Sequence, residues 1–146
     1  MERQQHWDSI YETESVTNVS WYEAEPQASL DLIETASPTH GSVIDVGGGA
    51  SILVDRLLAV GFNRVAVLDI SAAALEHAKL RLGAQAGQVQ WLVADITETR
   101  DLGQFDVWHD RAGNNVYPRC NILQPNRQLI LNIFVNYNKR GDSCIT

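Results

Sequence analysis

The chain has few of the features that mark a secreted or membrane-spanning protein. Its 146 residues include only two cysteines, Cys120 and Cys144, which have neither the spacing of metal ligands nor the density of a disulfide framework. No apolar run approaches the roughly 20 residues that a membrane-spanning helix needs. The N-terminus also lacks the apolar centre of a signal peptide. We therefore expect a cytoplasmic protein in a reducing setting.

Basic residues are also scarce. Eleven Lys and Arg against 18 Asp and Glu give a net charge of −7 at pH 7. This argues against non-specific binding to nucleic acid, because such binding needs a basic surface. The length leaves room for one domain with one core. We expect neither a metal ion nor a membrane as partner, and no catalytic residue is assigned.

Residues 43–51 organise the chain. They begin as an apolar, β-branched run that is typical of a strand buried in a parallel sheet. Gly47, Gly48 and Gly49 follow, and they allow a sharp turn and a close approach of the backbone to a ligand. Asp45 is the exception, because a carboxylate within an apolar strand is unfavourable unless it is paired. We expect its partner to be a ligand cation or the amides of the glycine loop.

Two common cofactor loops are excluded by what this loop lacks. The dinucleotide fingerprint needs a third glycine where Ile52 stands, which disfavours a nicotinamide dehydrogenase, and no phosphate-binding Gly-Lys-Ser/Thr is present. The observed pattern, Asp45-x-Gly47-x-Gly49, resembles motif I of the class I S-adenosylmethionine-dependent methyltransferases. The resemblance implies that both glycines lie against the methionine and ribose of the cofactor, and that Asp45 helps hold the loop and the amino group. On the glycines alone, a tight turn in another α/β protein is the alternative.

Two further buried strands, at 64–70 and 89–96, also carry an acid near the end. In a doubly wound sheet the second strand ends beside the first, so Asp69 is placed to accept hydrogen bonds from a ribose diol, with Ile70 beside it. The alternative role for Asp69 is a helix N-cap, although Ser71 is available for that. The resemblance implies that Asp95 accepts from the adenine amino group and that the backbone amide of Ile96 meets the ring.

Four aromatic residues precede the first strand. Trp7 and Tyr11 are four residues apart, so they share a face of the helix expected over residues 3–13. Such rings either pack against the core or close over a cofactor, because a sulfonium is attracted to an aromatic face. The pair, followed by Tyr22, resembles the N-terminal arm of the small protein-lysine methyltransferases. That resemblance implies that Trp7, Tyr11 and Tyr22 cover the cofactor.

Helices are expected between the strands. Pro26 is suited to the first position of a helix that runs to Ala36. Apolar spacing predicts further helices over 51–60 and 71–82. His40 lies in a turn-rich break, and we expect it to be solvated.

Residues 105–111 resemble the fourth strand of the family, whose end faces the transferred methyl group. The resemblance implies that Arg111 lies at the cofactor. His109 and Asp110 are candidate contacts to the substrate or to the methionine, and an exposed loop histidine without a role is the alternative for His109.

The resemblance fades after residue 111, where the chain becomes basic and rich in asparagine. We expect 1–111 to form the cofactor-binding core, with an N-terminal arm over 1–36, and 112–146 to form a divergent tail. Residues 129–135 are expected to add a fifth strand, without the family's later strands. That strand would be an apolar edge, so we expect self-association through 128–136.

The sequence therefore predicts an α/β fold with a Rossmann-like, doubly wound, mostly parallel sheet in the order 3-2-1-4-5. Two functions fit this fold. The first is an S-adenosylmethionine-dependent methyltransferase that acts on a protein lysine or a small molecule. The second is a cofactor-binding or scaffold module with impaired catalysis.

Overall fold

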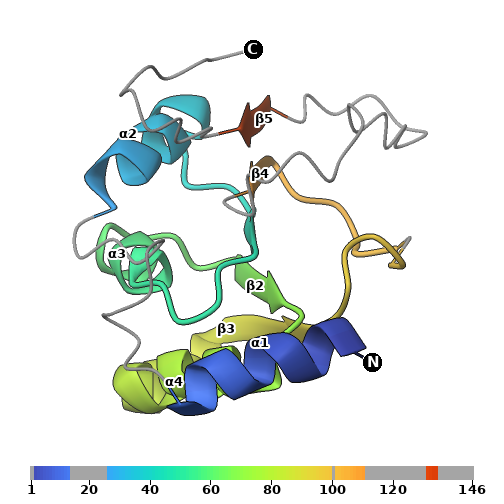
Figure 1. Ribbon diagram of the computed structural model, residues 1–146. Helices are drawn as coiled ribbons and strands as arrows, with labels where there is room; N and C mark the ends of the chain where they lie inside the picture. Colours follow the sequence, from blue (N-terminus) through green and yellow to red (C-terminus); the bar gives the residue numbers. More distant parts are fainter. Residues whose placement is uncertain (1, 14–25, 100, 111–130, 135–146) are drawn as a thin grey trace.

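A computed structural model of the chain describes residues 2–13, 26–99, 101–110 and 131–134. The helices are α1 (Glu2–Thr13), α2 (Gln27–Ala36), α3 (Leu53–Ala59), α4 (Ala72–Leu82) and the short 3-10 helix η2 (Gly83–Gln88). The strands are β1 (Val43–Val46), β2 (Val65–Asp69), β3 (Val89–Val93), β4 (Val107–Asp110) and β5 (Leu131–Phe134). Helices and strands alternate from α2 to β3 (Figure 1).

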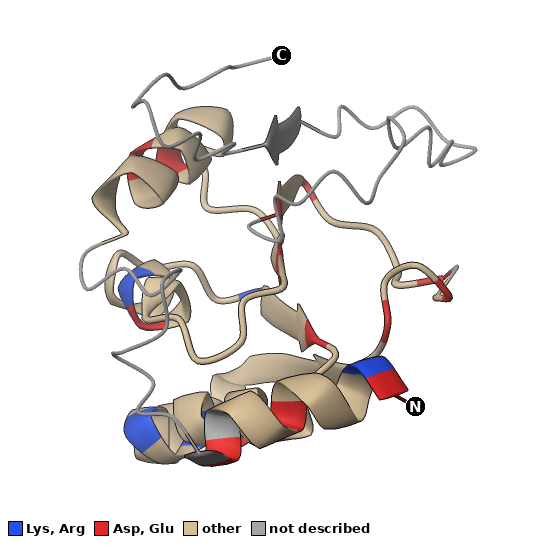
Figure 2. Ribbon diagram, viewed as in Figure 1, with Lys and Arg blue, Asp and Glu red and all other residues tan. Residues whose placement is uncertain are grey.

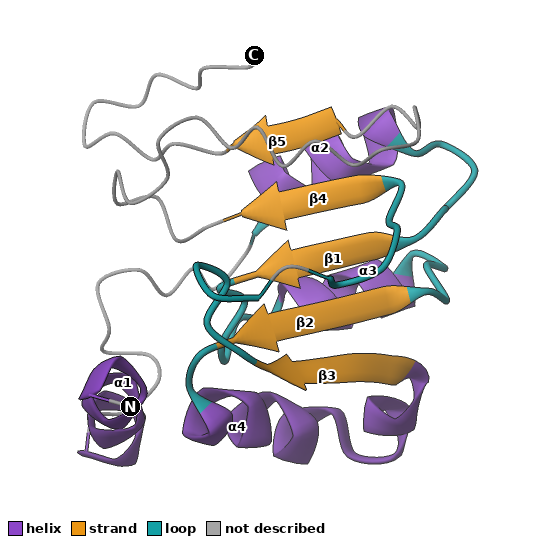
Figure 3. Ribbon diagram, turned by 90° about the vertical axis from the view of Figure 1, so that its right-hand side faces the viewer, coloured by secondary structure: helices purple, strands orange, loops and turns teal. Residues whose placement is uncertain are grey.

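The five strands form one sheet in the order β3-β2-β1-β4-β5, and every neighbouring pair is parallel. All the strand arrows point the same way in Figure 3. Val43 in the central strand β1 is in register with Val65 on one side and with Val107 on the other. The predicted α/β fold and strand order are confirmed, and β5 lies within the predicted range 129–135.

Helices cover one face of the sheet. In Figure 3, α2 and α3 lie behind the strands and α4 runs beside β3. Their apolar side chains, including Ile33, Leu57 and Leu75, share one buried cluster with Val43 and Val67. Because side chains alternate along a strand, Asp45 and His109 point toward this same face.

The segment between β3 and β4 crosses the other face (Figure 3). There, Ile44, Val46, Ala66 and Leu68 form a second buried cluster. Side chains from the crossing segment and from β4, among them Phe105 and Trp108, pack against it. The central strand is therefore covered on both faces, which explains its nearly continuous apolar sequence.

The ends of the helices follow from local residues. Ser71 caps α4 and accepts a hydrogen bond from the Ala74 N–H at 3.1 Å, as its position predicted. Gly83, at φ +58°, ends that helix, and Gly61, at φ +106°, follows α3. No helix in the described part of the chain is long and apolar enough to cross a membrane.

Some local predictions differ from the structure. Strand β3 ends at Val93, so Asp95 follows the strand instead of lying within it. The 3-10 helix η2 was not predicted. His40 is half-buried against Phe62, with ring centroids 4.5 Å apart, so the prediction of a solvated side chain is wrong. An apolar ring close behind the turn gives the imidazole a surface to pack on.

Candidate functional site

The glycine loop closes the carboxyl end of β1. Its Gly47 and Gly48 N–H groups donate to the carbonyl oxygen of Leu68 at 2.8 and 3.3 Å. Gly47 and Gly49 have φ values of +70° and +47°, which favour glycine. A Cβ on Gly48 would lie 2.6 Å from Asp45 Oδ2 and 2.8 Å from Val67 Cγ1, so these two side chains leave no room for another one there. The loop is therefore folded tightly over the ends of β1 and β2.

Arg81 of α4 fastens the end of this loop from outside. Its guanidinium donates to the carbonyl oxygens of Ala50 and Ser51, both at 2.9 Å. It also forms an ion pair with Asp55, with Nη2 and Oδ2 2.6 Å apart. Sequence reasoning missed this residue. From the sequence alone, a basic side chain that bonds to loop carbonyls looks the same as one that is exposed to solvent.

Asp69 lies at the end of β2, beside the glycine loop. It is 8% exposed, and the Ser71 N–H donates to its Oδ1 at 2.9 Å. Burial raises the pKa of this carboxyl to about 6, and the charge of Asp45 adds to the rise. Hydrogen bonds from the amides of Ser71, Gly49 and Ile70 partly offset it. Asp69 is thus an ionised carboxylate at neutral pH that further donors would stabilise.

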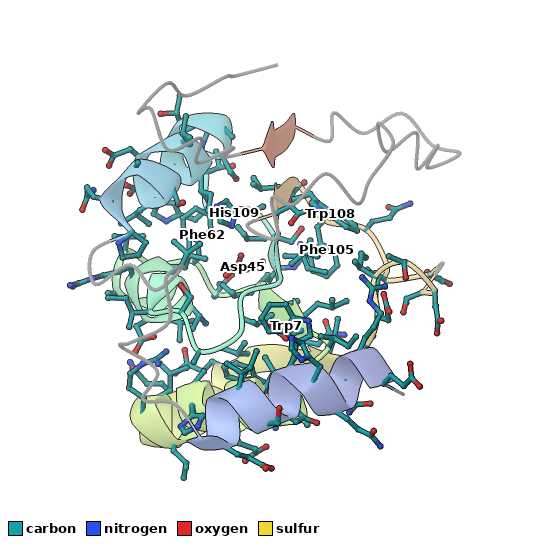
Figure 4. All side chains as sticks on the ribbon, in the orientation of Figure 1. Trp7, Asp45, Phe62, Phe105, Trp108 and His109 are labelled. Carbon is teal, nitrogen blue, oxygen red and sulfur yellow. The ribbon has the colours of Figure 1, made fainter. Side chains whose placement is uncertain are left out.

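Asp45 has a different partner from the one predicted. Its Oδ1 lies 2.7 Å from His109 Nδ1, and His109 Nε2 lies 3.1 Å from Ser29 Oγ. Figure 4 shows Asp45 and His109 close together between the helices and the sheet. The predicted ligand cation or loop amide is therefore not needed to pair this carboxylate, because a histidine in register on β4 does so.

His109 is 0% exposed, which corrects both predictions made for it. It is neither an exposed loop histidine nor placed to touch a substrate, since its ring is enclosed by Asp45 and Ser29. Sequence reasoning missed Ser29 altogether. Asp110, the other candidate substrate contact, is half-buried at the carboxyl end of β4.

Asp95 is held by its own loop and by α1. Its Oδ1 accepts from the Thr97 backbone N–H and hydroxyl at 2.8 and 2.6 Å, and its Oδ2 accepts from Arg3 at 3.2 Å. The Thr97 hydroxyl, more than any other group, holds the pKa of Asp95 below its usual range. Ile96 packs against the second cluster. The adenine contact of these two residues stays a prediction.

Helix α1 lies beyond the carboxyl ends of the strands, next to α4 (Figure 3). Its Asp8 accepts from the Ser71 hydroxyl at 2.6 Å and from the Ala73 N–H at 3.3 Å, so it caps α4 from another helix. Trp7 packs against Ala50 and Ala74. The packing role of this ring is therefore present, and its role as a cover for the cofactor stays a prediction.

Three predicted cofactor contacts remain. Tyr11 belongs to α1. Tyr22 and Arg111 lie outside the described residues. In Figure 2, acidic residues mark α1 and the end of β2. This edge of the sheet thus combines a tight glycine loop with buried carboxylates, an arrangement that suits a ligand with hydroxyl donors and positive charge.

A family model described as a methyltransferase domain matches residues 43–120, which is more than half of the chain. The chain belongs to this methyltransferase family. The site fits the cofactor that the resemblance implies, S-adenosylmethionine: the loop turns tightly at Gly47 and Gly49, and Asp69 offers a buried acceptor beside it. No curated protein matches the chain.

Several solved structures are similar to this chain. One was solved in work on the conversion of a disulfide bond into a thioacetal group during echinomycin biosynthesis. It has 27% identity and a TM-score of 0.59, over 74% of this chain and 46% of that one. The N-methyltransferase NodS from Bradyrhizobium japonicum, solved with S-adenosylhomocysteine, has 18% identity and a TM-score of 0.53, over 72% and 54%. The glycopeptide N-methyltransferase MtfA has 18% identity and a TM-score of 0.52, over 74% of this chain and 46% of that one. The chain spans about half the length of these proteins.

Proposed function

We propose that this chain binds S-adenosylmethionine at the carboxyl edge of its sheet and directs the methyl group to a small molecule. The observation that carries the proposal is the position of Asp69. It is a buried carboxylate that accepts a hydrogen bond from Gly49 of the glycine loop. A ribose diol would supply the donors that favour its ionised form.

The chain's residues have simple tasks in this reaction. The bound cofactor supplies an activated methyl group, so the protein contributes alignment and a site from which water is excluded. Gly47 and Gly49 bring the backbone close to the cofactor, and Asp69 fixes its ribose. Trp7 and Tyr11 of α1, with Tyr22, would cover it, and Asp95, Ile96 and Arg111 would complete its surroundings.

The class of acceptor is supported by one comparison. The similar structure at 27% identity comes from the biosynthesis of a small molecule, and it also has the highest TM-score of the three. A protein lysine is the second candidate acceptor, favoured by the helical arm with Trp7 that docks at this edge. Transfer assays with amine, thiol and hydroxyl compounds and with lysine peptides separate these two candidates.

A module with impaired catalysis is the alternative function. It is favoured by residues 112–146, where the sequence departs from the family's pattern in the region expected to complete the substrate side of the site. Such a module would bind S-adenosylhomocysteine and transfer no methyl group to any acceptor.

Calorimetry with S-adenosylhomocysteine and with NAD tests the proposal. We expect saturable binding of S-adenosylhomocysteine and no heat from NAD, because the third glycine of the dinucleotide loop is absent. Equal binding of both ligands, or binding of NAD alone, would contradict the assignment of the cofactor.

A further inference from the structure

Three buried side chains from distant parts of the chain form one hydrogen-bonded row. Asp45 of β1 contacts His109 of β4 at 2.7 Å, and His109 contacts Ser29 of α2 at 3.1 Å. Resting on the proposed cofactor site, we propose that His109 is a positioning residue, which holds Asp45 under the glycine loop so that the loop can receive the methionine end of the cofactor.

The row has the order of a hydrolytic triad, but it is closed to substrates. Ser29, His109 and Asp45 are 1%, 0% and 1% exposed. A nucleophilic serine must be reached by the group that it attacks, and Ser29 Oγ faces the imidazole inside the helix-covered side of the sheet. The row therefore does not react with a substrate. It positions a group of the protein itself, the carboxylate of Asp45.

Asp45 is in direct contact with the loop. Its Oδ2 lies 2.6 Å from the position that a Cβ on Gly48 would take, and Gly47 begins the loop two residues after it. The carboxylate fits there only because Gly48 has no side chain, so the position of Asp45 and that of the loop are linked. The charge of Asp45 also reaches Asp69, the proposed ribose acceptor, whose pKa it helps to raise.

The imidazole can hold Asp45 in either of its protonation states. A neutral ring donates from Nδ1 to Asp45 and accepts the Ser29 hydroxyl at Nε2, whereas a charged ring donates at both nitrogens. Both states satisfy all three groups, and no buried side-chain nitrogen or oxygen in the described residues lacks a hydrogen-bond partner. The position of the carboxylate is thus fixed from behind, which leaves the loop side free for the cofactor.

Two substitutions of His109 separate positioning from packing. His109→Leu introduces an apolar side chain of similar bulk and removes both ring nitrogens. His109→Asn keeps an amide donor near the position of Nδ1. We expect the dissociation constant of S-adenosylhomocysteine to rise about tenfold or more in His109→Leu and about threefold or less in His109→Asn, because the hydrogen bond to a charged group is lost only in the first.

Phe62→Leu is the matched control. Phe62 is equally buried on the helix-covered face, but it precedes β2 and so lies at the opposite end of the sheet. We expect this variant to lose stability and to keep its affinity. Wild-type affinity in a folded His109→Leu, or equal losses in the Leu and Asn variants of His109, would overturn the inference.

A second measurement covers the case in which His109→Leu does not fold. Ser29→Ala removes only the outer hydrogen bond of the row. In the absence of ligand, we expect the amide resonances of Gly47–Gly49 to shift in Ser29→Ala and to stay in place in Phe62→Leu. Unchanged loop resonances in Ser29→Ala would refute positioning by this row.

The resonances also distinguish the two proposals. Loop shifts in Ser29→Ala, together with a wild-type protein that binds no S-adenosylhomocysteine, would refute the proposed function and leave the positioning role in place. Tight binding by the wild type, with no response of the loop or of the affinity to either row variant, would refute the positioning role alone.

Discussion

Replacement of Asp69 by asparagine tests the centre of the proposed site. The substitution keeps the size of the side chain and removes its charge. If the ribose hydroxyls donate to this carboxylate, binding of S-adenosylhomocysteine should weaken by about 1.5–3 kcal/mol, the range for a hydrogen bond to a charged group. Calorimetry at pH 7.5, chosen to lie above the pKa of about 6, would measure the loss.

The pH dependence of binding gives a second measure of the same contact. Because the pKa of Asp69 in the folded protein is raised to about 6, the acceptor form is complete only above that pH. Affinity in the wild type should be nearly constant above about pH 7, begin to decline near pH 6, and fall by up to about tenfold for each further unit below it. Asp69→Asn should show no such decline.

The stability of the ligand-free protein should fall as the pH rises, whereas the affinity for the cofactor should rise. A carboxyl whose pKa is raised binds its proton more tightly in the folded state, so folding is favoured at low pH and weakened as the pH rises from 3.8 to about 6. The shift corresponds to about 3 kcal/mol at neutral pH. Asp69 therefore weakens the ligand-free fold, and a bound ribose would recover part of that free energy.

Asp106→Asn is the control for this experiment. Asp106 accepts from the backbone N–H and hydroxyl of Ser42 at 2.7 and 2.9 Å, just before β4 and so at the amino end of the sheet. The same chemical change there should lower stability and leave the affinity intact. A folded Asp69→Asn protein with wild-type affinity and pH profile would remove Asp69 from the site and refute the argument from strand order.

Three further predictions concern the groups around the site. Deletion of residues 1–14 should speed the release of S-adenosylhomocysteine in stopped-flow experiments. The stability of the ligand-free protein should fall by about 1 kcal/mol through loss of the Asp8 cap and further through loss of the Trp7 packing. A loss of stability with unchanged release would show that α1 only packs. Arg81→Ala should lower the free energy of unfolding in urea by about 1–3 kcal/mol, more than Asp55→Ala, which keeps the bonds to the loop carbonyls. Self-association through 128–136 should appear in sedimentation and be abolished by Ile133→Lys, because β5 is the last strand of the sheet among the described residues; a monomeric wild type would contradict it.

The fold was predictable because its signals are local. Strands β1 and β2 are short, mainly apolar runs, each is followed by a turn, and the helices α2, α3 and α4, which each have an apolar face, alternate with the first three strands. Parallel strands with such connections leave few possible arrangements. The positions of Asp69 and the glycine loop follow directly, since strand order alone brings the ends of β1 and β2 together.

The polar contacts of the site were not predictable in the same way. Asp45 and His109 are 64 residues apart in the sequence, and His109 and Ser29 are 80 apart. Their contacts depend on the register of β4 and on the packing of α2, neither of which a single sequence fixes. Arg81 belongs to the same class, because its partners become neighbours only when α4 lies beside the glycine loop.

The two buried carboxylates of this edge have different tasks for a physical reason. Asp45 already has a side-chain partner in His109, so it contributes its position to the loop and needs no ligand. Among the described residues, Asp69 accepts from backbone amides, and burial still raises its pKa to about 6. Because burial disfavours the ionised form of Asp69, a further hydrogen-bond donor would stabilise that form. The resemblance to the family assigns both acids to the cofactor site, and their contacts favour a division of that role in the proposed site: Asp45 would shape the loop, whereas Asp69 would accept from the ribose.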